Sequence, residues 1–374
     1  MRSASVLTLA YLLIVGACSA EASNTAPPKP EWQVSLGVPS YPGKARLRPS
    51  VRPAAIFIAP GELAVAYANA APKDSQSAWE ANLVLMSARD GAIRTRRTFG
   101  MAGSNAGIFR SEQGKLVIWL GDRLEVLSPQ TLLTEKSREV EGSVQPYSDG
   151  ERIILLKSNV TTVETGPQTG YARGSGFNVS FVRLDTLETQ VSCESAGVGL
   201  PHAIQGNHLA NTMTGGGGRW AIYLGTLCGD WKRISDLQGR TDFLSPERLV
   251  VTARPDTDHP RLAVITITGR EVCGTELKKY SGSLEPVAPS LGGTRFAVKI
   301  HDLAGLEIPA LDIYRHVSKA HIAVYGFTNG ICTPSLLDVP TKVSSRPPFD
   351  FALSFDGGHL VILGDGQVRM FRVP

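Results

Sequence analysis

Short apolar stretches alternate with turns rich in Gly, Asp, Pro and Ser along most of this chain. The clearest copy lies at the C-terminus, where Ser354-Phe355-Asp356-Gly357 precedes the apolar residues 360–363 and Gly364-Asp365-Gly366 precedes the mostly apolar residues 368–371. Short runs of this kind, bounded by residues that favour tight turns, are typical of β-strands joined as hairpins. No segment keeps a helical apolar period over several turns, so the pattern predicts an all-β chain with few helices.

The turn-and-strand phrase recurs seven times, counting one weak copy at Gly206-Asn207-His208-Leu209. The other apolar strands that follow such a turn are residues 63–67, 116–119, 153–156, 249–251, 296–298 and 360–363. The mean spacing of about 50 residues between copies matches the length of a four-stranded propeller blade. The repeat therefore predicts a seven-bladed β-propeller, with six and eight blades as the alternatives.

The second half of each repeat also has a recognisable pair of strands. We expect the first strand of each pair at residues 83–86, 124–127, 181–184, 221–224, 262–265 and 311–314. The hairpin turns between the two strands are expected at Asp90-Gly91, Ser128-Pro129, Asp185-Thr186, Gly229-Asp230, Thr268-Gly269 and Ser318-Lys319. The last repeat supplies only three strands, whereas residues 32–36 form a lone strand at the other end of the chain. We predict that this N-terminal strand becomes the fourth strand of the C-terminal blade, because closing the ring hides strand edges that would otherwise pair with other chains.

The closing copy resembles the repeat phrase of WD40-like and YVTN-type bacterial β-propellers, in which S-P-D-G precedes an apolar strand and V-x-V-Y-D ends the unit. Here the phrase reads Ser354-Phe355-Asp356-Gly357 and then Val368-Arg369-Met370-Phe371. The resemblance covers most of the chain and implies a bacterial propeller of this type. PQQ-type propellers, such as the outer-membrane assembly lipoprotein, are similar in architecture. The Gly-His pair and terminal Trp-Asp of WD40 blades are not present.

The N-terminus has the pattern of a secretory signal, because Arg2 is followed by apolar residues 6–15. This run is shorter than the roughly 20 apolar residues of a membrane-spanning helix. Val15-Gly16-Ala17-Cys18 resembles a bacterial lipobox, which implies a signal peptide at 1–17 and lipidation of Cys18; ordinary cleavage after Ala20 or Ala22 is the alternative. Residues 18–30 are small, polar and Pro-containing and are predicted to form a flexible tether, and residues 31–374 the propeller domain.

Cysteine usage points to an oxidising compartment. Of five cysteines, lipidation of Cys18 leaves an even set, Cys193, Cys228, Cys273 and Cys332, which allows three pairings. We favour Cys193 with Cys228 and Cys273 with Cys332, since each bridge would join neighbouring repeats and add about 3 to 4 kcal/mol. Four buried free thiols are the alternative. No C-x-x-C is present, so a zinc site is not predicted.

The connections between the second and third strands of the blades differ in length. Blades two and seven have the tight turns Gly121-Asp122 and Gly364-Asp365-Gly366, whereas the other blades have residues 69–80, 158–176, 212–218, 255–260 and 301–309. These connections lie on one face, and insertions collected there are typical of a binding face. Aromatic residues and Arg often anchor interfaces, so the candidates are Trp79, Tyr171, Arg173, Trp220, His259 and His301. The alternative is that they are solvated or packing residues.

Signatures of catalysis and of nucleotide binding are missing. No serine lies in G-x-S-x-G, and Gly215–Gly218 leads into Arg219 rather than Lys-Ser/Thr. Asp256-Thr257-Asp258-His259 lacks EF-hand spacing and is interpreted as a loop turn, so neither a metal nor another cofactor is predicted. A net charge of +4 without a basic cluster argues against nucleic acid as a partner.

The leading hypothesis is an exported, lipid-anchored β-propeller that acts as a binding or scaffold module at the bacterial cell envelope, in the periplasm or at the outer membrane. Its expected partners are envelope proteins, a small ligand or a glycan. It is expected to contact the membrane only through its lipid anchor and to be a monomer. Two alternatives stay open. One is a propeller-type hydrolase, lyase or quinoprotein-like oxidoreductase with its site in the central channel, and the other is a carbohydrate or small-molecule sensor.

Overall fold

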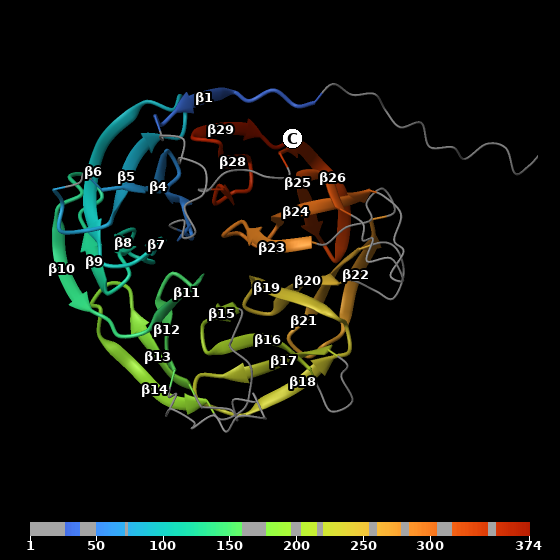
Figure 1. Cartoon of the computed structure of the whole chain (residues 1–374). Helices are drawn as coiled ribbons and strands as arrows, with labels where there is room; N and C mark the ends of the chain where they lie inside the picture. The colour runs from blue at the N-terminus through green and yellow to red at the C-terminus, as the bar shows by residue number, and fades with distance from the viewer. Residues whose placement is uncertain are drawn as a thin grey trace, which may run out of the picture.

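The computed structural model of this chain describes residues 27–37, 50–71, 74–158, 177–195, 203–214, 220–253, 260–277, 284–304, 316–342 and 349–374. The strands in these ranges form seven sheets arranged in a ring (Figure 1), and no helix occurs among them. The prediction of an all-β, seven-bladed propeller is therefore confirmed.

Each sheet is a blade whose strands run in chain order from the ring axis to the rim, except that β1 is the outermost strand of blade 7 (Figure 1). Blade 1 has β3 (Ala55–Ala59), β4 (Glu62–Ala70), β5 (Trp79–Ser87) and β6 (Ile93–Met101); blade 2 has β7 (Asn105–Arg110), β8 (Leu116–Trp119), β9 (Arg123–Leu127) and β10 (Thr134–Glu139); blade 3 has β11 (Ser143–Ser148), β12 (Arg152–Ser158), β13 (Phe177–Arg183) and β14 (Thr189–Ser195). Blade 4 has β15 (Ala203–Gln205), β16 (His208–Thr214), β17 (Trp220–Thr226) and β18 (Trp231–Ser235); blade 5 has β19 (Gly239–Ser245), β20 (Arg248–Ala253), β21 (Arg261–Thr266) and β22 (Glu271–Glu276). Blade 6 has β23 (Leu284–Pro289), β24 (Arg295–Ala304), β25 (His316–Thr328) and β26 (Ile331–Thr341); blade 7 has β27 (Asp350–Leu353), β28 (His359–Gly364) and β29 (Gln367–Arg372), completed by β1 (Trp32–Ser35).

The core lies between the blades, because every blade packs both faces against its neighbours. The middle strands are consequently apolar on both faces, as in β8, where all four residues from Leu116 to Trp119 are buried. The outer strand of the same blade, β10, is exposed at nearly every position and is polar throughout. This gradient from apolar middle strands to polar outer strands explains why the sequence shows runs of continuous apolar residues rather than simple alternation.

The N-terminal strand closes the ring, as predicted. β1 pairs antiparallel with β29, so that Trp32 lies opposite Met370 and Ser35 opposite Gln367. The Trp32 indole N–H donates to the Ala88 carbonyl at 2.9 Å, which ties the closing strand to the outer hairpin of blade 1. Gly91 in that hairpin has a φ of +73°, and a Cβ there would lie 2.7 Å from the Trp32 side chain. Only glycine fits this turn, so the closing strand and the hairpin are matched in shape.

Two inner-strand aspartates join neighbouring blades near the ring axis. In blade 5, Asp242 accepts a hydrogen bond from the Val287 N–H of blade 6 at 3.0 Å. In blade 7, Asp350 accepts from the Ala54 and Ala55 N–H groups at the start of blade 1. Each carboxyl thus satisfies backbone donors at or beside the following inner strand, which has a strand neighbour on one side only.

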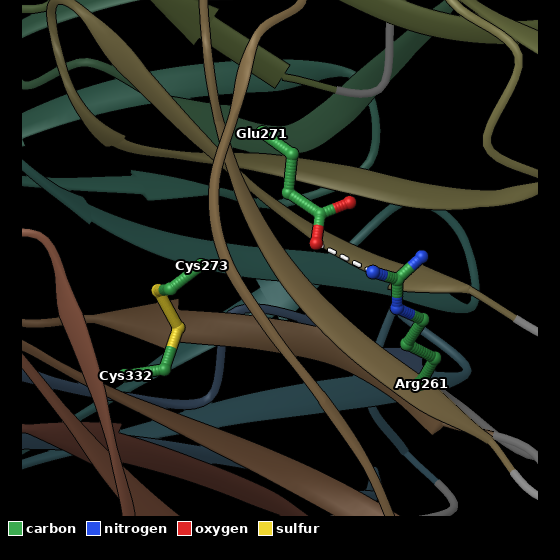
Figure 2. Close-up of a disulfide and its surroundings, with 4 residues drawn as sticks. All are labelled: Arg261, Glu271, Cys273 and Cys332. Atoms are coloured by element: carbon green, nitrogen blue, oxygen red, sulfur yellow. Dashed lines mark hydrogen bonds and ion pairs between the residues drawn. A yellow bond between two sulfur atoms is a disulfide. The ribbon is translucent and has the colours of Figure 1, made fainter.

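Two disulfides join neighbouring blades at the rim. Cys193 of β14 bonds Cys228 in the outer hairpin of blade 4, and Cys273 of β22 bonds Cys332 of β26. The Cα atoms are 5.6 Å apart in both bridges, within the usual range. Figure 2 shows the second bridge beside the ion pair between Arg261 and Glu271, two residues of the same outer hairpin. The favoured pairing is confirmed, and each bridge links adjacent blades where they diverge most.

Blade 6 differs from the prediction. Ser318 and Lys319 lie inside β25 rather than in a hairpin turn, so that prediction is wrong. The turn is instead Asn329-Gly330, whose φ values of 52° and 80° suit a two-residue hairpin loop of this composition. The predicted strand at 311–314 lies outside the described residues. The chain also forms a short strand that the sequence did not indicate, β2 (Ser50–Val51), parallel to β7.

Candidate functional site

The antiparallel order of the strands sorts the connections onto two opposite faces of the ring. Turns between the first and second strands of a blade, and between the third and fourth, lie on one face, which we call the turn face. Connections between the second and third strands, and from one blade to the next, lie on the other, which we call the long-connection face. Because β29 ends at Arg372 where β1 begins at Trp32, residues 27–31 and the C-terminal residue both lie at the turn face.

The strand bounds agree with the predicted contrast in connection length. Between the second and third strands, blade 2 has only residues 120–122 and blade 7 only residues 365–366. The same connections in blades 1, 3, 4, 5 and 6 are residues 71–78, 159–176, 215–219, 254–260 and 305–315. The long connections therefore all leave the ring at one face, opposite the turns and residues 27–31.

The structure describes the positions of three of the six predicted binding residues, Trp79, Trp220 and His301. Trp79 begins β5 at the long-connection face and packs, half-buried, against the core around blade 1. Trp220 begins β17, and its side chain lies outside the described part of the structure. His301 lies within β24 rather than in a loop, because this strand continues to Ala304. Tyr171, Arg173, His259 and Cys18 lie outside the described residues.

A pocket of about 420 Å³ opens at the long-connection face between blades 6 and 7. Blade 6 contributes the end of its outer strand with Thr341 and Lys342, and Phe349 leads into the first strand of blade 7. The remaining wall is the hairpin of blade 7 with Asp365, Gln367 and Arg369. The volume falls in the range of small-ligand sites. Among the described residues, the tight turn of blade 7 leaves this part of the face open.

Charged side chains surround the pocket. Lys342 and Asp365 form an ion pair of 3.1 Å at its mouth, with the lysine side chain 76% exposed. Deeper, the Lys299 ammonium lies 4.3 Å from the Phe349 ring centre. The Arg369 guanidinium is half-buried and lies 5.9 Å from the Phe371 ring centre. Burial lowers the pKa of Arg369, and the nearby Asp365 carboxylate opposes part of that effect.

Arg369 has no hydrogen bond or ion pair from its side chain among the residues that the structure describes. The Thr341 hydroxyl oxygen, also in the wall, is buried and has no hydrogen-bond partner among the described residues. Buried polar groups are normally satisfied, and a desolvated guanidinium keeps its N–H donors available for an acceptor. The pocket therefore combines donors without acceptors, one aromatic wall and an excess of positive charge.

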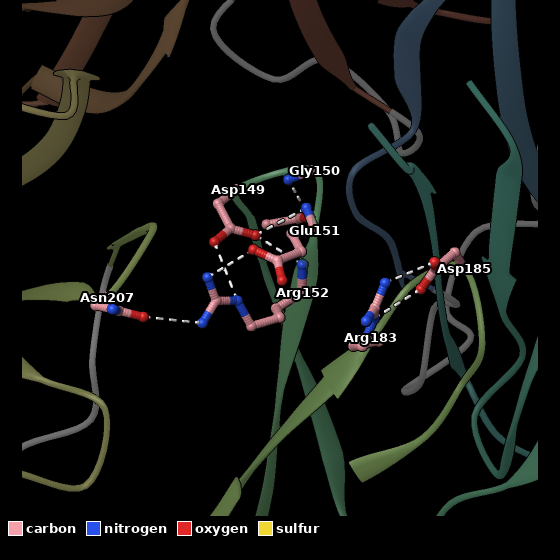
Figure 3. A network of polar contacts seen from close by, with 8 residues as sticks. Asp149, Gly150, Glu151, Arg152, Arg183, Asp185 and Asn207 are labelled. Atoms are coloured by element: carbon pink, nitrogen blue, oxygen red, sulfur yellow. Dashed lines mark hydrogen bonds and ion pairs between the residues drawn. The ribbon is translucent and has the colours of Figure 1, made fainter. Parts of the chain in front are cut away.

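A second polar cluster has a structural role. Figure 3 shows the turn of blade 3, where the Asp149 carboxylate accepts from the Glu151 and Arg152 backbone N–H groups at 3.0 and 2.7 Å. Arg152, 4% exposed, pairs with Glu151 at 2.8 Å and donates to the Asn207 side chain of blade 4 at 3.4 Å. Burial raises the pKa of Asp149 despite these contacts. The cluster fixes adjacent turns at the turn face.

In the described part of the chain, no group of three or more His, Cys, Asp or Glu side chains is arranged to hold a metal. The described part also contains no helix long and apolar enough to cross a membrane. The pocket was not predicted from the sequence, since its residues come from the ends of two blades. Their proximity depends on the closed ring.

No protein-family model matches this chain, and no curated protein matches it either. Among solved structures, it is similar to a chain of the mitotic checkpoint complex, with 11% identity, a TM-score of 0.52 and coverage of 93% of this chain and 95% of that one. It is also similar to Pyrococcus horikoshii acylaminoacyl peptidase, with 12% identity, a TM-score of 0.52 and coverage of 87% of this chain and 52% of that one, so it spans about half of the peptidase. BamB from Moraxella catarrhalis shares 12% identity with a TM-score of 0.39 over 80% of this chain and 82% of its own. At such identities the similarity shows the fold alone, and this chain is an all-β, seven-bladed β-propeller.

Proposed function

We propose that this protein is a binding or scaffold module of the bacterial cell envelope that recognises its partners through the long-connection face. The observation that carries the proposal is the one-sided distribution of connection lengths, with long connections in five blades and tight turns in blades 2 and 7. A rigid ring that displays variable connections on one face is the usual design of a recognition scaffold. Three of the six candidate residues, Tyr171, Arg173 and His259, belong to these connections.

The position of the N-terminal segment supports an anchored orientation. Residues 27–31 approach β1 from the turn face, so a lipid on Cys18 would hold that face toward the membrane and leave the long-connection face toward possible partners. The two disulfides favour an exported protein, because such bonds persist in oxidising compartments. We therefore propose that the protein is tethered at the envelope with its recognition face outward from the bilayer.

The anchor is tested by Cys18→Ser. A single thiol-to-hydroxyl change removes the acceptor of the lipid and leaves the propeller untouched, so the variant is expected to move from the membrane fraction to the soluble envelope fraction. Cys193→Ser, which removes a rim cysteine instead, is the matched control and is expected to stay with membranes. Retention of the Cys18→Ser variant in the membrane fraction would refute lipid anchoring.

The recognition face is tested by affinity capture from the native envelope. The double variant Tyr171→Ala with Arg173→Ala removes two anchor candidates from the connection 159–176, and it is expected to lose at least about 90% of a partner that the wild type retains. Leu133→Ala, at a side chain 63% exposed on the turn face, is the control and is expected to retain that partner. Equal capture by both variants, or loss only with Leu133→Ala, would contradict the proposal.

A further inference from the structure

We infer that the pocket between blades 6 and 7 is a binding site for a carboxylate group. The inference rests on the proposed function, because the pocket opens at the long-connection face. It adds the chemical class of a ligand to that proposal. The group would be held by Arg369, with the Gln367 amide, the Thr341 hydroxyl and Lys342 as further donors. Phe349 would contact the apolar part of the ligand next to the carboxylate.

Arg369 is the central donor of the pocket. Its guanidinium is half-buried, lies 5.9 Å from the Phe371 ring centre, and makes no ion pair or hydrogen bond to any residue that the structure describes. An arginine held partly out of water without an acceptor has given up hydration that a ligand oxygen can replace. Its planar N–H pair matches the two oxygens of a carboxylate, which makes such a contact stronger than a neutral hydrogen bond.

Further donors surround Arg369. The buried Thr341 hydroxyl lacks a partner among the described residues, and Gln367 lies on the same strand as Arg369 and on the same face, two residues away. Both side chains line the pocket with Lys342. A hydroxyl, an amide and a guanidinium from two blades therefore converge on one cavity, and none of them has to be brought there by a change of fold.

The charge of the pocket wall distinguishes between anions. Lys342 and Arg369 bring two positive charges to the wall and Asp365 offsets one of them, whereas Lys299 lies behind Phe349 and is not part of the wall. A singly charged carboxylate matches the one remaining charge, and a dianionic phosphate would leave an excess of negative charge beside Asp365. The flat Phe349 wall, backed by Lys299 at 4.3 Å, favours a carboxylate attached to an aromatic or apolar group.

Two sources can supply this group, a free organic acid and the C-terminus of a peptide. Isothermal titration calorimetry of the full-length protein separates them with four probes: benzoate, benzamide, the acid form of an N-acetyl-alanyl-phenylalanine dipeptide, and the amide of the same dipeptide. We expect saturable binding of at least one acid and at least about tenfold weaker binding of its amide. Added salt is expected to lower the affinity for the acid. Inorganic phosphate is expected to bind more weakly than either acid.

The variant Arg369→Gln is expected to weaken binding of the acid by at least about tenfold, and Arg369→Lys by less, because lysine keeps the charge but not the planar donor pair. Arg372→Gln, at an exposed arginine on the same strand, is the matched control and is expected to bind as the wild type does. If Arg369→Gln does not unfold cooperatively, Lys342→Gln is the test variant instead. This change is at an exposed side chain, leaves Asp365 without its ion pair to Lys342, and should also weaken binding of the acid.

Absence of saturable binding by both acids overturns the inference, as does equal binding of acids and amides or unchanged affinity in Arg369→Gln and Lys342→Gln. A preference for phosphate over both acids also overturns it. These outcomes are independent of partner capture, because the probes are small molecules and the variants leave the connection 159–176 intact. A failed capture with successful titration would refute the proposed recognition of proteins and keep the carboxylate site.

Discussion

Deletion of residues 1–36 is expected to lower the midpoint of thermal unfolding by about 10 °C or more, whereas deletion of residues 1–30 is expected to leave it unchanged. The longer deletion removes β1 and with it Leu36, which is 2% exposed, and the packing of Trp32 and Val34 against the core of blade 1. Loss of a buried leucine and a packed tryptophan together costs at least about 5 kcal/mol. The shorter deletion removes only the predicted signal and tether.

The longer deletion also uncovers β29 as an edge strand. Its backbone donors and acceptors would face solvent where they now pair with β1, and exposed edges promote association between chains. We therefore expect the variant lacking residues 1–36 to elute in oligomers or aggregates, measured by size-exclusion chromatography with light scattering. A monomeric variant with the wild-type midpoint would show that β1 does not close the ring.

Asp242→Asn is expected to change how stability depends on pH. Asp242 is 8% exposed, and burial raises the pKa of its carboxyl from 3.8 to about 7, because one backbone hydrogen bond and Arg240 offset the cost of burying the charge only in part. Between these two values the unfolded chain releases the proton and the folded chain keeps it. The free energy of unfolding therefore falls as pH rises through this range, by on the order of 4 kcal/mol, and that loss is complete above the folded pKa.

The asparagine variant lacks this titration. We subtract the free energy of unfolding of the wild type from that of the variant at each pH. This difference should be larger at pH 8 than at pH 4, by on the order of 4 kcal/mol. Urea denaturation at both pH values measures it. Asp236→Asn, which removes a carboxylate that is 80% exposed, is the control for charge loss alone. A difference between wild type and Asp242→Asn that does not vary with pH would refute the assignment of a neutral carboxyl to the folded state.

Much of the fold could be predicted because each blade carries its own local signals. The phrase around Asp356-Gly357, the lone strand at residues 32–36 and the spacing of four cysteines each follow from local turn chemistry or from simple pairing. Blade 6 was mispredicted because polar Ser318 and Lys319 resemble a turn, although they lie near the start of the long strand β25. The Asn329-Gly330 pair, a stronger hairpin signal, marks the true turn.

The pocket could not be predicted for a different reason. In the sequence, Arg369 is one polar position in a strand, with nothing to distinguish it from Arg372 three residues later. What distinguishes Arg369 is that it faces blade 6 beside Thr341 and Phe349, across a boundary between blades. Such contacts depend on the angle between sheets rather than on the pattern within one, so a local reading misses them.

Partners are proposed to bind at the long-connection face, and site-specific photo-crosslinking in the native envelope tests this most directly. Gln76, exposed in the connection between β4 and β5, and Gln130, exposed in the turn between β9 and β10, place one photoreactive residue on each face. We expect the protein carrying the photoreactive residue at position 76 to form discrete adducts that the protein carrying it at position 130 does not form. Adducts from position 130 alone, or from neither position, would contradict the account.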